Sequence, residues 1–324
     1  MTKSKENLRG ALLALSAFGL FATHDVVVKF LGGFYSPVQV LFFGVLFSFP
    51  LVTMMLLRDK TDGNLIPRHP MWTLVRTVAI VITGVCAFYA FGKLPLAQAY
   101  AIFFSTPLLI TVLAIPILGE TVRLRRGLAV VVGLIGVLIV LRPGSATLGL
   151  AHAAALLASV TGALASVIVR KVGQDERSAV LMLYPMVANF IAMGCALPFV
   201  YQPMPLPHLG GFMTMAVLGS AGTFCIIAAY KKAEATVVAP MQFSQIVWAT
   251  GFGYVLFGET VDRATVAGAA IVIASGSYIL FRESRAKVSD TQPVLQTRGR
   301  SETGTIPRGS LVQRLGEEAR LRGE

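Results

Sequence analysis

Charged residues are scarce in this sequence, and their scarcity decides its class. Only 14% of the 324 residues are Asp, Glu, Lys or Arg, against roughly 25% in soluble domains, while 55% are hydrophobic. A membrane-spanning helix needs about 20 apolar residues. The sequence therefore predicts an all-α integral membrane protein with ten transmembrane helices, at about 8–31, 36–57, 71–92, 95–118, 123–141, 149–170, 178–201, 208–230, 235–258 and 263–281.

Residues that carry redox, metal or nucleotide chemistry are also scarce. The three cysteines, Cys86, Cys195 and Cys225, all fall in apolar segments and lack metal-ligand spacing. No Gly-rich loop ending in Lys-Ser/Thr is present to hold nucleotide phosphates. We expect no catalytic residues, no metal and no cofactor, and the sequence offers no basis for ATP-driven pumping.

Acidic residues are outnumbered by basic ones, 16 to 28. The basic residues gather at alternate ends of the apolar segments, on the side that holds the N-terminus, which marks that side as cytoplasmic. Both termini are therefore expected in the cytoplasm, and nucleic acid is not an expected partner. On the cytoplasmic side lie Lys3, Lys5, Arg9, Arg58, Lys60, Arg68, Arg123, Arg125, Arg126, Arg170, Lys171, Arg177, Lys231 and Lys232, against Lys29, Lys93, Arg142 and Arg263 on the other.

An internal repeat organises the chain. The letters GETV occur at 119–122 and again 139 positions later at 258–261, and VVVKFLG (26–32) resembles VIVRKVG (167–173). These matches predict two homologous five-helix units, 8–143 and 147–284, followed by a basic tail, 285–324, that we expect to be cytoplasmic and disordered. Because five is odd, the second unit enters the membrane from the opposite side. Such inverted-topology repeats are common in secondary transporters, whose substrate sites lie between the repeats.

This arrangement resembles the EamA-type drug/metabolite transporter superfamily. The resemblance covers about 8–284 and rests on two five-helix units, each with a short loop before its fourth helix and Gly-Glu after it. It implies a bacterial inner-membrane location and alternating access through a central cavity lined by helices one to four and six to nine. The expected partners are the lipid bilayer and a small organic metabolite, such as an amino acid, vitamin or nucleoside-type compound. A coupled proton, a homodimer and the direction of transport stay open.

Two other functions remain as alternatives at this point. An intramembrane enzyme acting on a lipid or prenyl substrate would need several acids or a nucleophile in one cavity. A membrane sensor would signal through the 285–324 tail.

Asp25 is the one acidic residue inside an expected span. Lys29 lies one helical turn further on, on the same face, so the two form either a structural ion pair or part of a binding or proton-coupling site. Histidine is the side chain that can titrate near neutral pH, so His24 is a further candidate for proton coupling. Adjacent helix residues point about 100° apart, so we do not expect His24 and Asp25 to form one relay. In the second repeat Lys29 is matched by Arg170, whereas Asp25 is matched by Ser166.

Helices four and nine supply the other polar candidates. Tyr100 and Ser105 precede a proline, and Gln242 and Gln245 share a helix face that Trp248 continues. These groups offer hydrogen bonds and an aromatic wall to a substrate, or bond packed helices to each other.

The remaining polar positions are weaker candidates. Tyr89 is a further aromatic candidate, and Arg76 either binds an anionic group or extends to the membrane surface. Glu120 and Glu259 each end a helix beside glycine, and we expect them to be structural. The candidate substrate or coupling residues are His24, Asp25, Lys29, Arg76, Tyr89, Tyr100, Ser105, Gln242, Gln245 and Trp248.

Overall fold

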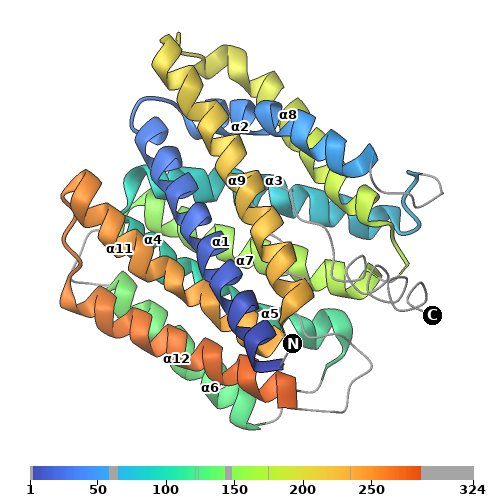
Figure 1. The fold of residues 1–324 in the computed structure, drawn as a ribbon, viewed down its shortest axis with the longest axis vertical. Helices are drawn as coiled ribbons and strands as arrows, with labels where there is room; N and C mark the ends of the chain where they lie inside the picture. Colours follow the sequence, from blue (N-terminus) through green and yellow to red (C-terminus); the bar gives the residue numbers. More distant parts are fainter. Residues whose placement is uncertain are drawn as a thin grey trace.

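A computed structural model of the chain describes residues 3–57, 65–120, 122, 124–142, 148–173, 175–233 and 235–285. Within these ranges all regular structure is helical (Figure 1). Apart from its first residue, the predicted tail lies outside the described residues. The first half contains α1 (Lys3–Gly32), α2 (Pro37–Leu57), α3 (Pro70–Lys93), α4 (Leu96–Phe103), α5 (Thr106–Leu118) and α6 (Leu124–Leu141). The second half contains α7 (Leu150–Val172), α8 (Ser178–Val200), α9 (Leu206–Lys232), α10 (Ala235–Val238), the short 3-10 helix η1 (Ala239–Phe243), α11 (Ser244–Phe257) and α12 (Arg263–Arg285).

The helices follow the ten predicted spans closely. Seven helical segments in the described part are long and apolar enough to cross a membrane, with Leu96–Leu118 counted as one segment. Two shorter apolar stretches, Pro37–Pro50 and Arg263–Ile279, occupy the second and tenth predicted spans. The ninth predicted span is divided among α10, η1 and α11. The all-α membrane architecture is confirmed, and seven of the ten predicted spans meet the length and composition of a crossing helix.

The two divided spans occupy equivalent places in the two halves. The α4–α5 break precedes Pro107, and η1 contains Pro240. Proline lacks a backbone N–H and frees a carbonyl, which a membrane helix tolerates where neighbours or a cavity satisfy that group. After the breaks, α5 and α11 both end at a glycine with positive φ, 70° at Gly119 and 65° at Gly258. These glycines close the helices in the left-handed conformation and place Glu120 and Glu259 directly beyond them.

Packing between the halves builds the core. The most extensive contacts join α1 to α9, α3 to α7 and α6 to α12, and each of these pairs takes one helix from each half. In Figure 1, α1 and α9 run side by side across the front of the molecule, and α12 lies beside α6 at its edge. The interior between the halves is therefore formed by both repeats.

The contact between α6 and α12 is a close crossing of two glycines. A Cβ atom added to Gly136 would lie 2.9 Å from the Gly268 carbonyl oxygen, and one added to Gly268 would lie 2.5 Å from the Gly136 carbonyl oxygen. Small residues permit this approach of two membrane helices. The predicted fifth and tenth helices thus pack against each other within one chain.

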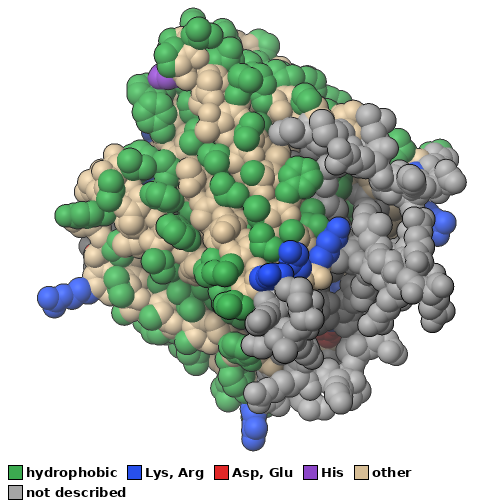
Figure 2. Space-filling view, in the orientation of Figure 1, with side chains coloured by type: hydrophobic (Ala, Val, Ile, Leu, Met, Phe, Trp, Pro, Cys, Tyr) green, Lys and Arg blue, Asp and Glu red, His purple; other side chains and the backbone are tan. Residues whose placement is uncertain are grey.

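The outer surface is apolar, as a bilayer requires. Val247, Tyr254 and Val255 of α11 are 67–75% exposed. Figure 2 shows hydrophobic side chains spread across the visible face, with few Lys or Arg side chains among them.

Candidate functional site

Asp25 lies at the centre of a buried polar network. Asp25 is 1% exposed and His24 is 2% exposed. The Nδ1 atom of His24 lies 2.8 Å from Oδ1 of Asp25, and the hydroxyl of Tyr100 donates to Oδ2. Gln245 Nε2 in turn donates to the Tyr100 oxygen at 3.4 Å. The network therefore connects α1 and α4 of the first half with α11 of the second.

The expectation that His24 and Asp25 act separately is wrong. Their Cβ atoms point apart by the usual helical angle, but both side chains extend several bonds from the backbone and bend toward each other. The resulting 2.8 Å contact is short enough for proton exchange between the ring and the carboxyl group.

Lys29 has partners away from its own helix. Its Nζ lies 2.7 Å from Oε1 of Glu259 and donates to the Leu94 carbonyl at 2.5 Å. The side chain therefore reaches the end of α3 and the end of α11, whereas Asp25 is bonded by Tyr100 of α4. Lys29 pairs with Glu259 rather than with Asp25, so the ion pair between Asp25 and Lys29 considered from the sequence is not what this face of α1 forms.

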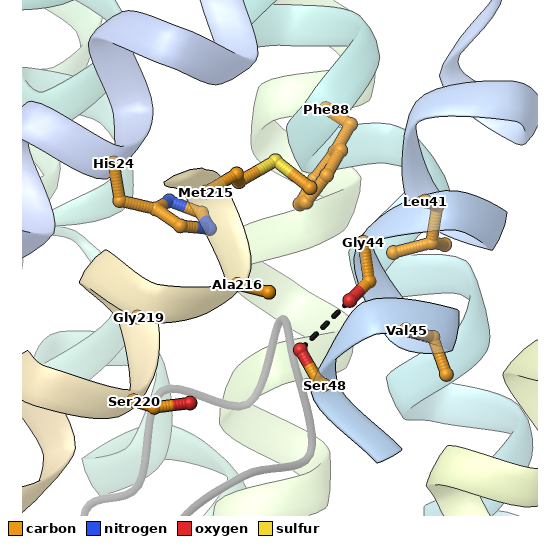
Figure 3. A pocket seen from close by; sticks show the side chains of 10 residues that line it. All are labelled: His24, Leu41, Gly44, Val45, Ser48, Phe88, Met215, Ala216, Gly219 and Ser220. Carbon is orange, nitrogen blue, oxygen red and sulfur yellow. Dashed lines mark hydrogen bonds between the residues drawn. The ribbon is translucent and has the colours of Figure 1, made fainter. Parts of the chain in front are cut away.

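A narrow central cavity lies beside His24. The cavity has a volume of about 10 Å³, room for a single water molecule. Figure 3 shows His24 and α9 on one side of it and residues of α2 on the other. The added-Cβ position of Gly219 lies 3.4 Å from Cδ2 and 3.8 Å from Nε2 of His24, so this glycine leaves space for the ring. The lining residues are His24, Leu41, Gly44, Val45, Ser48, Phe88, Met215, Ala216, Gly219 and Ser220.

A second cavity lies between the ends of α1 and α3 and the start of α2. Its volume is about 130 Å³, room for several waters, and we call it the vestibule. Phe88 lines both cavities, and its ring packs edge-on against the imidazole of His24, with centroids 6.4 Å apart. Phe88 thus forms the wall between the vestibule and the central cavity. The vestibule is lined by Val28, Gly32, Tyr35, Ser36, Pro37, Val40, Phe88, Tyr89, Gly92 and Lys93.

A tyrosine–histidine bond anchors the vestibule to α9. The Tyr35 hydroxyl lies 2.6 Å from Nδ1 of His208. Burial raises the pKa of the Tyr35 phenol above its usual value, and the nearby Tyr201 adds to that shift. The phenol therefore stays protonated at neutral pH, and its hydroxyl shares a hydrogen bond with His208.

The structure brings together four of the ten candidate residues: His24, Asp25, Tyr100 and Gln245. Tyr89 lines the vestibule. Ser105 is buried at the α4–α5 break, and Gln242 is buried in η1.

Arg76 and Trp248 lie away from both cavities. Arg76 donates from Nη1 to the Leu181 carbonyl at 2.5 Å, tying α3 to α8. Trp248 is 42% exposed, packs beside Gly19 of α1 and stacks on Phe252.

Sequence reasoning missed the charge pairing of Glu120 and Glu259. Glu259 pairs with Lys29, and Glu120 pairs with Arg170, so their role is not limited to ending helices. The signal that points to them was present in the sequence, because each repeat carries one base and one acid at matched positions. The cavity-lining residues Phe88, Gly219 and Ser220 gave no such signal, since apolar and small residues are ordinary throughout membrane helices.

Comparison with known proteins agrees with this architecture. The model of the EamA-like transporter family matches residues 8–142 and 149–281. The chain belongs to this family. The resemblance to this family, the two-repeat helical architecture and the predicted function, secondary transport of a small molecule, are thereby confirmed.

Relatives of this EamA-like transporter differ in their direction of transport. One is the S-adenosylmethionine uptake transporter of Rickettsia prowazekii, 25% identical over 288 residues that cover 88% of this chain and 97% of the relative. Another is the pseudopaline exporter CntI of Pseudomonas aeruginosa, 26% identical over 270 residues that cover 82% and 94%. A crystal structure that shares 16% identity superimposes with a TM-score of 0.57, covering 89% of this chain and 100% of its own. That likeness concerns the fold alone.

Proposed function

We propose that this transporter carries an organic metabolite through the central cavity and that the His24–Asp25 pair couples its movement to a proton. The position of His24 is the observation that supports this proposal. Its ring lines the cavity and also contacts the carboxylate of Asp25 at 2.8 Å. A proton entering the cavity therefore has a direct route to a buried acid.

The network favours one arrangement of protons. When Asp25 is ionised, it accepts from Tyr100 and from the N–H at Nδ1 of His24. In a neutral imidazole with its proton on Nδ1, Nε2 carries the lone pair that can accept a proton. Because the edge formed by Cδ2 and Nε2 lies beside Gly219 of the cavity wall, Nε2 is positioned to accept a proton from the cavity.

Protonation of Asp25 would change the contacts between helices. A proton passed from Nδ1 leaves Oδ1 donating back to His24, and the neutral acid accepts a weaker hydrogen bond from Tyr100 than the carboxylate does. Tyr100 is bonded to Gln245 of the second half, so this weakening at Asp25 reaches both repeats. This provides a physical link between proton binding and the relative movement of the repeats in alternating access.

The relatives support an organic metabolite as the substrate. They are named for uptake of S-adenosylmethionine and for export of pseudopaline, and direction is a matter for experiment. The bacterial relatives support the inner membrane as the location, and the distribution of basic residues supports a cytoplasmic position for both termini. We propose transport, without catalysis, as the whole activity of the helical region, and we propose repeat boundaries at 8–143 and 147–284.

The test begins by finding a substrate. Purified protein is screened for thermal stabilisation by a metabolite library, because a ligand that binds the folded state raises its apparent stability. The ligand is then followed in proteoliposomes, as transport driven by a pH gradient and as exchange without a gradient. We expect Asp25→Asn to abolish the first and retain the second. Gradient-driven transport at the wild-type rate in Asp25→Asn would remove Asp25 from the coupling step, and Ser166→Asn, at the matched position in the second repeat, is the control.

A further inference from the structure

Two ion pairs join the repeats in a crossed pattern. Lys29, near the end of α1, pairs with Glu259 beyond α11 at 2.7 Å. Arg170, near the end of α7, pairs with Glu120 beyond α5. Lys29 and Arg170 occupy matched positions in the repeats, as do Glu120 and Glu259. In each pair, the basic residue of one repeat therefore binds the acidic residue of the other repeat.

The direction of α1 relative to α3 follows from two contacts. His24 packs against Phe88, and further along, the added-Cβ position of Gly32 lies 3.1 Å from the Cα of Gly92. Residue numbers rise together along both helices, so α1 and α3 run in the same direction.

The direction of α7 is opposite. The hydroxyl groups of Thr83 and Thr161 lie 2.7 Å apart, and the Nζ of Lys171 sits 4.4 Å from the ring centre of Trp72. Residue numbers fall along α7 as they rise along α3. The ends of α1 and α7 therefore point to opposite faces of the membrane, and so do the two ion pairs.

The Lys29–Glu259 pair holds three segments together. Lys29 donates to the Leu94 carbonyl at the end of α3, and Oε2 of Glu259 accepts from the Leu96 amide at the start of α4 at 2.9 Å. A Cβ atom added to Gly253 would lie 2.6 Å from that same oxygen, so the glycine makes room for the acid.

A similar arrangement exists at the other face. Beside Arg170, the Nζ of Lys171 donates to the Ile117 carbonyl near the end of α5 at 2.8 Å. Arg170 pairs with Glu120 just beyond that end. The side chains of Arg170 and Glu120 are 9% and 23% exposed, and those of Lys29 and Glu259 are 11% and 15% exposed. Partly buried charges of this kind are costly to separate, because each loses its partner without regaining full hydration.

We infer that the two ion pairs are latches, each holding one face of the transporter closed, and that the transport cycle opens them in turn. The inference rests on transport by alternating access, in which inverted repeats exchange conformations. Both latches are formed here, in agreement with a central cavity that has room for one water. Separation of α1 from α11 breaks the Lys29 latch and opens the vestibule face, while the Arg170 latch holds the opposite face.

The test measures access to each face by the rate at which a membrane-impermeant maleimide labels single cysteines. Cys86, Cys195 and Cys225 are first replaced by alanine. Ser36→Cys reports the vestibule face, since Ser36 lines that cavity. Arg177→Cys reports the opposite face. Arg177 precedes α8 in the second repeat, as Ser36 precedes α2 in the first. The latch variants are Glu259→Gln and Glu120→Gln, because an amide oxygen at Glu259 still accepts from Leu96.

We expect Glu259→Gln to raise labelling of Ser36→Cys several-fold and to leave or lower labelling of Arg177→Cys. Glu120→Gln is expected to do the reverse. Lys29→Arg keeps a positive partner for Glu259 and a donor for the Leu94 carbonyl, so it should leave labelling near the wild-type rate. Asp262→Asn is the matched control, because its pair with Arg142 also joins the repeats but both side chains are well exposed, and such pairs contribute little.

Several outcomes would overturn the latches. They are equal labelling changes at both faces, no change at either, or a Lys29→Arg variant that labels like Glu259→Gln. Should Glu259→Gln fail to fold, Lys29→Gln breaks the same pair from its basic side and keeps a donor for the Leu94 carbonyl. Labelling needs neither a substrate nor a proton gradient. A labelling result that contradicts the latch proposal therefore does not bear on the proposed role of Asp25.

Discussion

The hydroxyl group of Tyr100 donates a hydrogen bond to the carboxylate of Asp25, and both residues are buried inside the helical bundle. Tyr100 lies on α4, just before the break that separates α4 from α5. A carboxylate in the membrane interior is costly unless it is bonded. The tyrosine therefore stabilises the acid and also connects it to a place where the helix is already interrupted.

Tyr100→Phe should keep the packing and remove this bond. The ring would still sit between Phe91 and Phe104, whose centroids lie 5.5 and 5.9 Å from that of Tyr100. Hydrogen bonds to charged groups contribute roughly 1.5–3 kcal/mol, so we expect a lower melting temperature in detergent and a weaker response to a pH gradient. Tyr89→Phe, in the vestibule wall, is the matched control. An unchanged melting temperature and pH response in Tyr100→Phe would show that the bond is unimportant.

His24→Asn separates the two roles of the histidine. The amide nitrogen of asparagine can donate to Asp25 much as Nδ1 does, but asparagine does not take up a proton near neutral pH. We expect the variant to fold and to exchange substrate, and to lose transport driven by a pH gradient. Melting temperature, exchange and gradient-driven uptake are the measurements. Retained gradient-driven uptake would assign His24 a structural role.

Phe88→Ala should join the vestibule to the central cavity. Phe88 is 3% exposed, and truncation of a buried phenylalanine costs about 3–5 kcal/mol. We expect a lower melting temperature together with faster maleimide labelling of Ser48→Cys in the central cavity. Phe30→Ala, at a ring that is 48% exposed, is the control. If labelling of Ser48→Cys stays slow, Phe88 is not the wall between the cavities.

Gly136→Ala should disrupt the crossing of α6 and α12. The added methyl group meets the Gly268 carbonyl oxygen at 2.9 Å, and overpacking of this kind costs about 1–3 kcal/mol. Gly127→Ala on the same helix is the matched control, because nothing lies within 4 Å of its added Cβ. The control should be neutral or slightly stabilising, since alanine favours helix over glycine by about 1 kcal/mol. Equal melting temperatures for the two variants would contradict the close crossing.

The fold could be predicted from the sequence because a membrane-spanning helix requires a run of apolar residues of a characteristic length. Runs of about 20 apolar residues, loop charges and the repeated GETV letters gave the segments and their inversion. The ninth span was predicted as one continuous segment, and it divides at η1, which contains Pro240, because proline cannot continue the hydrogen-bond pattern of a straight helix.

The site could be predicted only in part. Asp25 was conspicuous as the one embedded acid, but its partners depend on which helices meet, and the spacing rule that placed Lys29 beside it is local. In the structure Lys29 reaches Glu259, 230 positions away in the chain. Trp248 was a candidate for a cavity wall, yet it faces the exposed side of α11, because three-residue spacing fixes a common face without saying what that face meets.

Proton movement tests the central claim most directly. Substrate is added to proteoliposomes that enclose a pH-sensitive dye, and the internal pH is followed for the wild-type protein, Asp25→Asn and the Ser166→Asn control. The account predicts a substrate-dependent pH change for the wild type and the control, and none for Asp25→Asn at an equal rate of substrate exchange. The same pH change in Asp25→Asn would contradict it.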